Sequence, residues 1–394
     1  MIQSPRGPGL YVHLPFCSAI CPYCDFYVLT GEPDRRERFS RHLLAEIALV
    51  SDRPWPEFVD QPPPHEFDSL YLGGGTPSIL SPELLGRVIA GLRGSLRVVP
   101  EPWVALEANP EDVTVENVSA WKEMGVTFLS LGIQSFDDRS LEFLGRRHRS
   151  VASRTSIAAA RAAAFETLSI DLIYGLAGQS VDDWRADLEA AVELRPDHLS
   201  CYQLTIEEGT PFGYRQRRGQ LTELSDQDQV ELFFLTHRFL ADHGFEAYEV
   251  SNFATSPDHR SRHNSKYWDR TPYLAVGPSA HSFAGRDRWW NERKIRPYEH
   301  SVESGRRPIQ DHETLTPAQL CLERLLLGLR TPAGVDLDSL PGDWSERIWQ
   351  SNRDLIENLT DRQLLIVEAH QLRPTLAGLA LAESMARDFE IEGA

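Results

Sequence analysis

The chain has 394 residues, of which 41% are hydrophobic and 25% charged, which is typical of a folded globular protein rather than a disordered or collagen-like one. Its formal net charge of −18 repels phosphate backbones and anionic lipids, so we expect neither nucleic acid nor a membrane surface as a direct partner. The first nine residues lack the apolar segment of a secretory signal, which favours a cytoplasmic protein.

The first half of the chain alternates short apolar runs with amphipathic helical patterns. The apolar runs predict strands at residues 10–16, 69–72, 104–107, 128–134, 168–174 and 198–205. Helical periodicity predicts helices at residues 35–50, 82–96, 115–124, 150–164 and 181–194. Repeated strand–helix units imply a parallel sheet, and these units are too few for a closed eight-stranded barrel. We therefore predict an α/β fold with a partial (β/α)6 barrel of the TIM type over residues 1–210.

This alternation stops after about residue 210. A long helical pattern at 227–243 and a stretch rich in aromatic and histidine residues at 253–300 predict an α+β extension over 211–305. Helical patterns at 317–329 and 345–358, a hairpin at 364–374 and a last helix at 377–389 predict a small winged-helix-like module over 306–394. Residues 311–394 contain 7 Arg and no Lys against 15 Asp and Glu, so this module is expected to contact proteins or act as a lid rather than read DNA.

Three of the five cysteines fall within eight residues, as Cys17-x3-Cys21-x2-Cys24, directly after the first predicted strand. An odd number of cysteines at these spacings does not suit a disulfide framework. Three thiolates on one short loop suit a [4Fe–4S] cluster that keeps one iron without a protein ligand and therefore open to another molecule. A zinc site with His13 as the fourth ligand is the alternative.

This cysteine spacing, on a loop after the first strand of a partial barrel, resembles the radical S-adenosylmethionine (radical SAM) superfamily. In that family the open iron binds the amino and carboxylate groups of SAM, and an electron from the cluster cleaves SAM to a 5′-deoxyadenosyl radical. The Gly-Gly-Gly-Thr-Pro run at residues 73–77 matches a family element. The resemblance implies that Gly74, Gly75 and Thr76 contact the methionyl end of SAM, where glycines permit a close backbone approach.

Further sequence words resemble the coproporphyrinogen III oxidase-like branch of this superfamily. Four of them contain a polar residue at or beyond the end of a predicted strand: Leu-Glu-Ala-Asn-Pro, Leu-Gly-Ile-Gln-Ser-Phe, Leu-Gly-Arg-Arg-His and Ile-Asp-Leu-Ile-Tyr-Gly-Leu. The resemblance implies SAM contacts for Glu107, Gln134, Arg146 and Asp171, and also for Tyr11 and Tyr23. The carboxyl ends of barrel strands are also where such folds bind their ligands.

Within this branch the residues favour one function over another. The oxygen-independent coproporphyrinogen III oxidase has a further cysteine two residues after the third cluster cysteine, where this chain has Phe26, and a longer segment before its cluster. The words at 21–26, 202–207, 263–268 and 277–281 instead resemble the HemW-type haem chaperones. That resemblance implies binding of haem as cargo, delivery to haem-requiring respiratory proteins, a homodimer, and an encounter with the membrane only through the acceptor.

Haem itself requires an apolar slot and an axial ligand such as His, Tyr, Cys or Met. The aromatic stretch at 263–290 contains His263, Tyr267 and His281, of which His263 is our first choice as ligand; His13 and Cys201 are weaker candidates. The residues leave open whether haem is held covalently and whether SAM is cleaved. A radical SAM enzyme acting on a tetrapyrrole and a zinc-stabilised scaffold therefore remain as alternatives.

Overall fold

The computed structural model describes residues 7–64 and 66–392, so most of the segment inspected for a signal sequence lies outside the described residues. Its centre is a set of six parallel strands: β1 (Gly9–Leu14), β2 (Phe67–Gly74), β3 (Val98–Ala108), β4 (Phe128–Gln134), β5 (Thr167–Tyr174) and β6 (His198–Gln203). These strands are hydrogen-bonded to one another in sequence order. The predicted partial barrel is therefore confirmed.

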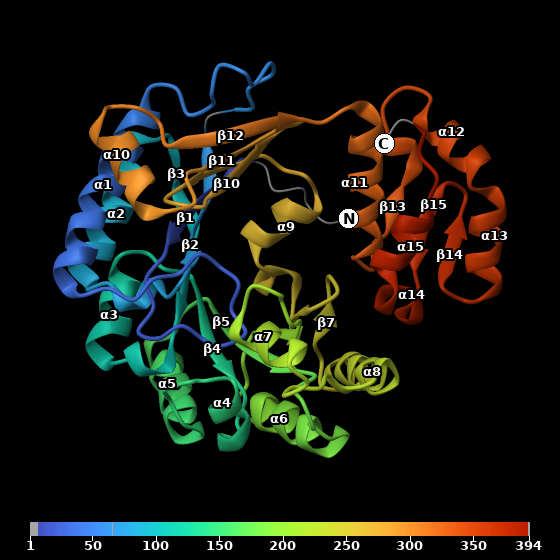
Figure 1. The fold of residues 1–394 in the computed structure, drawn as a ribbon, viewed down its shortest axis with the longest axis horizontal. Coiled ribbons are helices and arrows are strands. Elements are labelled where there is room, and N and C mark those ends of the chain that lie inside the picture. Colours follow the sequence, from blue (N-terminus) through green and yellow to red (C-terminus); the bar gives the residue numbers. More distant parts are fainter. Residues whose placement is uncertain (1–6, 65, 393–394) are drawn as a thin grey trace.

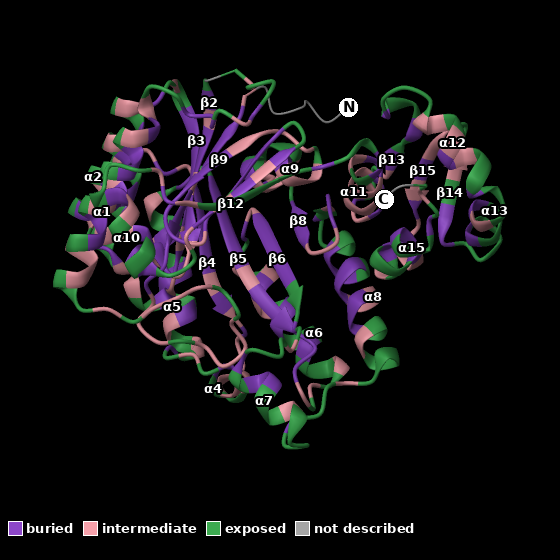
Figure 2. Cartoon of the chain, turned by 45° about the horizontal axis from the view of Figure 1, so that its top comes forward, coloured by how far each residue is buried: buried purple, intermediate pink, exposed green. Residues whose placement is uncertain are grey.

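Helices follow the strands and cover the outside of the sheet (Figure 1). They are α1 (Pro33–Ser51), α2 (Pro82–Ser95), α3 (Val115–Glu123), α4 (Asp138–Phe143), α5 (Ser150–Ala163) and α6 (Val181–Glu193), with short 3-10 turns η1 (Pro77–Ile79) and η2 (Pro110–Asp112). Side-chain caps begin several of them: the Ser81 side chain accepts a bond from Leu84 N, and Ser180 forms a capping box with Asp183. Figure 2 shows that β5 and β6 consist mostly of buried residues.

The extension after β6 continues the same sheet at both of its edges. It consists of α7 (Pro211–Arg217), α8 (Asp226–Asp242), β7 (Glu246–Ala247), β8 (Asn252–Ala254), η3 (Pro257–His259), α9 (Arg262–Trp268), β9 (Tyr273–Val276), β10 (His281–Ala284), β11 (Asp287–Asn291), α10 (Ile295–Glu303) and β12 (Ile309–Thr314). The resulting sheet has 12 strands in the order β12-β11-β10-β9-β1-β2-β3-β4-β5-β6-β8-β7. The extension and the barrel share one hydrophobic core, in which Tyr298 of α10 packs with Phe39 of α1.

The end of the chain forms a module with a core of its own, beside the barrel in Figure 1. It consists of α11 (Pro317–Leu329), β13 (Val335–Asp336), η4 (Leu337–Ser339), α12 (Trp344–Ser351), α13 (Arg353–Asp361), β14 (Leu365–Glu368), β15 (Gln371–Pro374), α14 (Leu376–Ala380) and α15 (Ala382–Asp388). Its three strands pair in the order β13-β15-β14. Helices followed by a hairpin agree with the predicted winged-helix-like arrangement. No helix within the described ranges is long and apolar enough to cross a membrane.

Candidate functional site

A cavity of about 520 Å³ opens at the carboxyl ends of the barrel strands, between these ends and the cysteine loop that follows β1. Most of the residues expected to hold a cluster or SAM line it: Cys17, Cys21, Tyr23, Cys24, Gly74, Gly75, Thr76, Glu107, Gln134, Arg146 and Asp171. Tyr11 and His263 do not line it. The fold thus brings together residues that are up to about 150 positions apart in the sequence, because parallel strands end at the same edge of a sheet.

The cysteine loop is anchored to the barrel through backbone hydrogen bonds. Gly75 N donates to Leu14 O at 2.8 Å and Thr76 N donates to Phe16 O at 2.7 Å. The glycine turn after β2 is therefore hydrogen-bonded to the start of the cysteine loop. Cys17 N donates to Leu29 O at 2.9 Å, which closes the loop on itself. The position of the cysteines therefore depends on the turn after β2.

Two glycines of that turn occupy places where no side chain fits. A Cβ on Gly75 would lie 2.7 Å from Phe16 O and 2.9 Å from Leu14 O. Gly74 has φ +109°, and a Cβ there would lie 2.6 Å from the His13 ring. Glycine tolerates both the left-handed backbone and the close packing. The glycine run is therefore required for the close contact between this turn and the end of β1.

The three cysteines of the loop are free thiols with polar neighbours. Thr76 Oγ1 donates to Cys17 Sγ at 3.5 Å, and Arg146 Nη1 donates to Cys21 Sγ at 3.7 Å. Burial raises the pKa of Cys17 to about 11 and also raises that of Cys24. A metal that binds such thiols must displace their protons, so its binding depends on pH.

No three His, Cys, Asp or Glu side chains in the described part of the chain are close enough together to share a single metal ion. In an iron–sulfur cluster each cysteine binds a different iron, so the three sulfurs need not converge on one point. The donor set of three thiols, without a fourth cysteine in the cavity lining, fits a cluster that retains one iron for another ligand.

Arg146 is a half-buried cation with one unused donor, its Nε. Its Nη2 donates to Asn109 Oδ1 at 2.6 Å and to Gly132 O at 2.9 Å. Its Nε is buried and has no hydrogen-bond partner among the described residues. A buried donor without a partner is costly, and an anionic ligand in the cavity would satisfy it.

Two half-buried acidic residues, Glu107 and Asp171, face the same cavity. Glu107 accepts a 2.7 Å hydrogen bond from the Tyr71 hydroxyl, and burial raises its pKa to about 7. Asp171 accepts bonds of 2.9 and 3.0 Å from Ser130 Oγ, and burial raises its pKa to about 6. Together with Arg146 they offer charges of both signs, which suits a ligand that carries an ammonium group, a carboxylate and hydroxyl groups.

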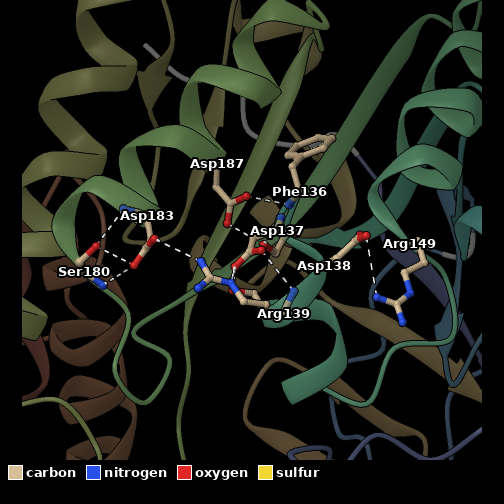
Figure 3. Close-up of polar contacts among 10 residues, drawn as sticks. Phe136, Asp137, Asp138, Arg139, Arg149, Ser180, Asp183 and Asp187 are labelled. Carbon is tan, nitrogen blue, oxygen red and sulfur yellow. Dashed lines mark hydrogen bonds and ion pairs between the residues drawn. The ribbon is translucent and has the colours of Figure 1, made fainter.

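Gln134 ends β4 in a left-handed conformation, with φ +70°, at a register shift of the sheet. Such a conformation costs free energy in a residue other than glycine and often marks a functional site. The loop that follows is held by Asp187 of α6, whose carboxylate accepts from Ser135 Oγ at 2.7 Å and from Phe136 N at 2.6 Å (Figure 3). The backbone that directly follows Gln134 is thus held from a neighbouring helix.

Some residues of the cavity were not predicted. Asn109 donates to Thr76 Oγ1 at 3.1 Å and accepts from Arg146, so it links the glycine turn to the cation. It stands two residues after Glu107 in the same sequence word, which was a usable signal. His198 also lines the cavity, with its ring nitrogens 2.7 Å from Ser169 Oγ and 2.8 Å from Tyr248 OH. It begins a strand, and no sequence pattern indicates which way it points.

The two remaining predicted residues lie behind this cavity. Tyr11 lines a neighbouring cavity, and its hydroxyl is 3.2 Å from His13 Nδ1. His263 is fully buried on α9, with Nε2 3.1 Å from Tyr267 OH and Nδ1 3.4 Å from Ser69 Oγ. Burial lowers the pKa of His263 to about 3, so its ring is neutral. Its role as a haem ligand stays a prediction.

Comparisons with known proteins match both the barrel and the terminal module. A model of the radical SAM superfamily matches residues 11–191, and a model of the HemN C-terminal domain matches residues 315–381. The chain is 30% identical over 394 residues to the heme chaperone HemW of Lactococcus lactis, covering 100% of this chain and 99% of that protein. It is 34% identical over 385 residues to the heme chaperone HemW of Mycobacterium tuberculosis, covering 96% and 94%.

Among solved structures, coproporphyrinogen III oxidase (HemN) from Escherichia coli aligns with a TM-score of 0.81 at 21% sequence identity. The alignment covers 98% of this chain and 91% of that one. At this identity the likeness establishes a common fold, which extends through the barrel, the extension and the terminal module.

Proposed function

Because this chain belongs to the HemW family within the radical SAM superfamily, we propose that it is a haem chaperone, which binds haem and delivers it to haem-requiring respiratory proteins. The observation that carries this proposal is the similarity to curated heme chaperones over the whole chain, at 30% and 34% identity. Phe26, at the position where the oxidase has a further cysteine, also favours a chaperone over that enzyme.

The cavity at the strand ends supports a resident cluster and SAM. Cys17, Cys21 and Cys24 would hold a [4Fe–4S] cluster, since they line one cavity and supply three thiols. When bound, such a cluster can supply the electron that cleaves SAM to a 5′-deoxyadenosyl radical. In the protein itself, the unused Nε–H of Arg146 suits the carboxylate of SAM, and Glu107 suits its ammonium group.

The glycine turn and two further polar residues complete this SAM site. Gly74, Gly75 and Thr76 present the backbone after β2 to the cavity, Gln134 is held there by its loop, and Asp171 offers acceptors for hydroxyl groups. Tyr23 lies on the cysteine loop and contributes an aromatic wall. Tyr11 lines the neighbouring cavity, so it would act on SAM only through the residues between them.

The partners follow from the same proposal. The terminal module is acidic and lies beside the barrel, which suits contact with an acceptor protein rather than with nucleic acid. We place haem delivery at the cytoplasmic side, with any membrane encounter made through the acceptor, and we expect a homodimer. Analytical sedimentation of the protein with and without the cluster measures whether it is a dimer.

The test is anaerobic reconstitution with iron and sulfide, followed by titration with haem and transfer to a haem-depleted respiratory enzyme. We expect broad visible absorption that dithionite bleaches, a saturable Soret band, and restored activity of the acceptor. Cys24→Ala should lose the cluster, whereas Cys321→Ala, in the core of the terminal module, should keep it. A cluster without haem uptake would contradict the chaperone and direct the assay to coproporphyrinogen. Zinc in place of iron would contradict the cluster.

A further inference from the structure

A second cavity, of about 540 Å³, adjoins the cluster cavity. The two share Asp25, Phe26, Gly74 and Glu107 as a common wall. Phe26 is 68% exposed although it is a large apolar residue, so beside the carboxyl groups of Asp25 and Glu107 this wall presents an aromatic ring that the described chain does not cover. The volume is in the range of pockets that bind small molecules and cofactors.

The lining of this second cavity is mainly aromatic. Rings come from β1, the cysteine loop, α9 and β9: Tyr11, Phe26, Tyr27, Tyr267 and Tyr273. Tyr267 and Tyr273 pack edge to face at 4.8 Å. Flat aromatic and apolar walls suit a large planar ring, and a haem additionally needs an iron ligand and cations for its two propionates.

His281 is the histidine of this cavity whose ring is available. It stands at the start of β10, is exposed, and stacks on Trp290 at 5.8 Å. In the part of the chain that the structure describes, its ring nitrogens have no hydrogen-bond partner. His13, the other histidine of the lining, has Nδ1 3.2 Å from Tyr11 OH and Nε2 3.1 Å from Tyr27 O, so both of its nitrogens are engaged.

The turn that carries His281 is held by hydrogen bonds to buried side chains. Gly277 has φ +102° and Ser279 has φ +63°, both in the left-handed region. Glu46, buried on α1, accepts from Gly277 N at 2.8 Å, and Asn291 Nδ2 donates to Gly277 O at 2.9 Å. A strained turn that is held from several sides is typical of a positioned functional group. The sequence word at 277–281 thus has a structural use that the cluster site does not explain.

Positive charge is available at the same cavity. Arg293 lines it, is exposed, and takes part in no ion pair among the described residues. Lys294 and Arg296 follow in sequence and are also exposed, at the start of α10. Three exposed cations within four residues, at the edge of this cavity, suit the binding of carboxylate groups.

We propose that this second cavity is the haem site, in which the His281 imidazole binds the haem iron and Arg293 binds a propionate. The assignment rests on the proposed haem-chaperone function and specifies its site. His263 then acts as a positioning residue: its Nε2 lies 3.1 Å from the Tyr267 hydroxyl and sets the ring that forms one wall. Haem in this place is separated from the cluster cavity only by the shared wall.

The test is titration of the full-length, reconstituted protein with Fe(III) protoporphyrin IX under anaerobic conditions. His281→Ala should change the Soret band and weaken haem binding at least about tenfold, equivalent to about 1.4 kcal/mol. It should leave the binding of metal-free protoporphyrin IX nearly unchanged, because the aromatic walls remain. Arg293→Gln should weaken both porphyrins but not the dimethyl ester, which has no carboxylates. The control His300→Ala, on the exposed side of α10, should bind haem as the wild type does.

The outcomes separate this assignment from the function on which it rests. Wild-type protein without a saturable haem band overturns the chaperone itself. If the wild type binds haem and His281→Ala binds it with the same Soret spectrum and affinity, only the assignment of the site is overturned. The same holds if His263→Ala, and not His281→Ala, loses the wild-type Soret band. If His281→Ala folds poorly, His281→Gly with added imidazole decides: return of the wild-type Soret band supports the assignment, and no return overturns it.

Discussion

Replacing Gly75 by alanine should loosen the cysteine loop from the barrel. The new Cβ would lie 2.7 Å from Phe16 O and 2.9 Å from Leu14 O, and both are backbone atoms that cannot rotate away. One of the two backbone bonds that anchor the loop, from Gly75 N to Leu14 O or from Thr76 N to Phe16 O, must lengthen. Overpacking costs about 1–3 kcal/mol, and a weakened hydrogen bond costs about 1 kcal/mol more.

We therefore expect Gly75→Ala to lower the free energy of unfolding by about 2–4 kcal/mol and to reduce iron loading after reconstitution. Denaturant titration measures the first quantity, and iron and sulfide analysis per chain measures the second. The matched control is Gly94→Ala in the last turn of α2, where an added Cβ meets nothing within 4 Å. Helix propensity predicts that this control is stabilised by about 0.5–1 kcal/mol. A Gly75→Ala protein with wild-type stability and full iron would refute the steric reasoning.

Three further predictions concern buried acids. Burial raises the pKa of Glu107 to about 7, so its ionised fraction rises from about 10% at pH 6 to about 90% at pH 8. The affinity for SAM should therefore rise about tenfold over this range relative to that of Glu107→Gln. Calorimetric titrations in which the SAM affinities of the two proteins change with pH in the same way would contradict this. Glu46→Ala removes the acceptor of three buried donors of the extension. It should cost at least about 3 kcal/mol in denaturant titrations, at about 1 kcal/mol or more for each donor left without a partner, and a loss below about 1 kcal/mol would count against a role of Glu46 in holding the turn at Gly277. Asp187→Ala frees the loop after Gln134 and should weaken SAM binding several-fold, unlike the exposed Asp183→Ala on the same helix; equal effects of both would argue against a positioning role.

The barrel was predictable because its signals are local. Strands buried on both faces appear as apolar runs, and the covering helices appear as 3.6-residue periods. Strand β4 spans the predicted residues 128–134. The helix predicted at residues 345–358 is instead two helices, α12 and α13, which break at Asn352. The Asn352 Nδ2 donates to Ile348 O and Glu390 O, and such hydrogen bonds from a side chain to the backbone compete with a continuous helix.

The added strands of the extension were not predicted. Strands β9, β10 and β11 have four or five residues each and mix aromatic with polar side chains, so neither a run nor a period identifies them. What places β9 is its parallel pairing with β1, some 260 residues earlier in the chain. Long-range pairing of this kind carries no local signal.

The sequence by itself determined which thiols and glycines the candidate site contains, since cysteine spacing and glycine content are properties of short segments. Tertiary structure decided which of two similar histidines is accessible. His263 lies on α9 against β1, so close that a Cβ on Gly9 would be 2.7 Å from its Nδ1, and it is fully buried. His281 begins β10 and stays exposed. The difference is physical: burial depends on what packs against a residue from distant parts of the chain, and that is settled only when the sheet assembles.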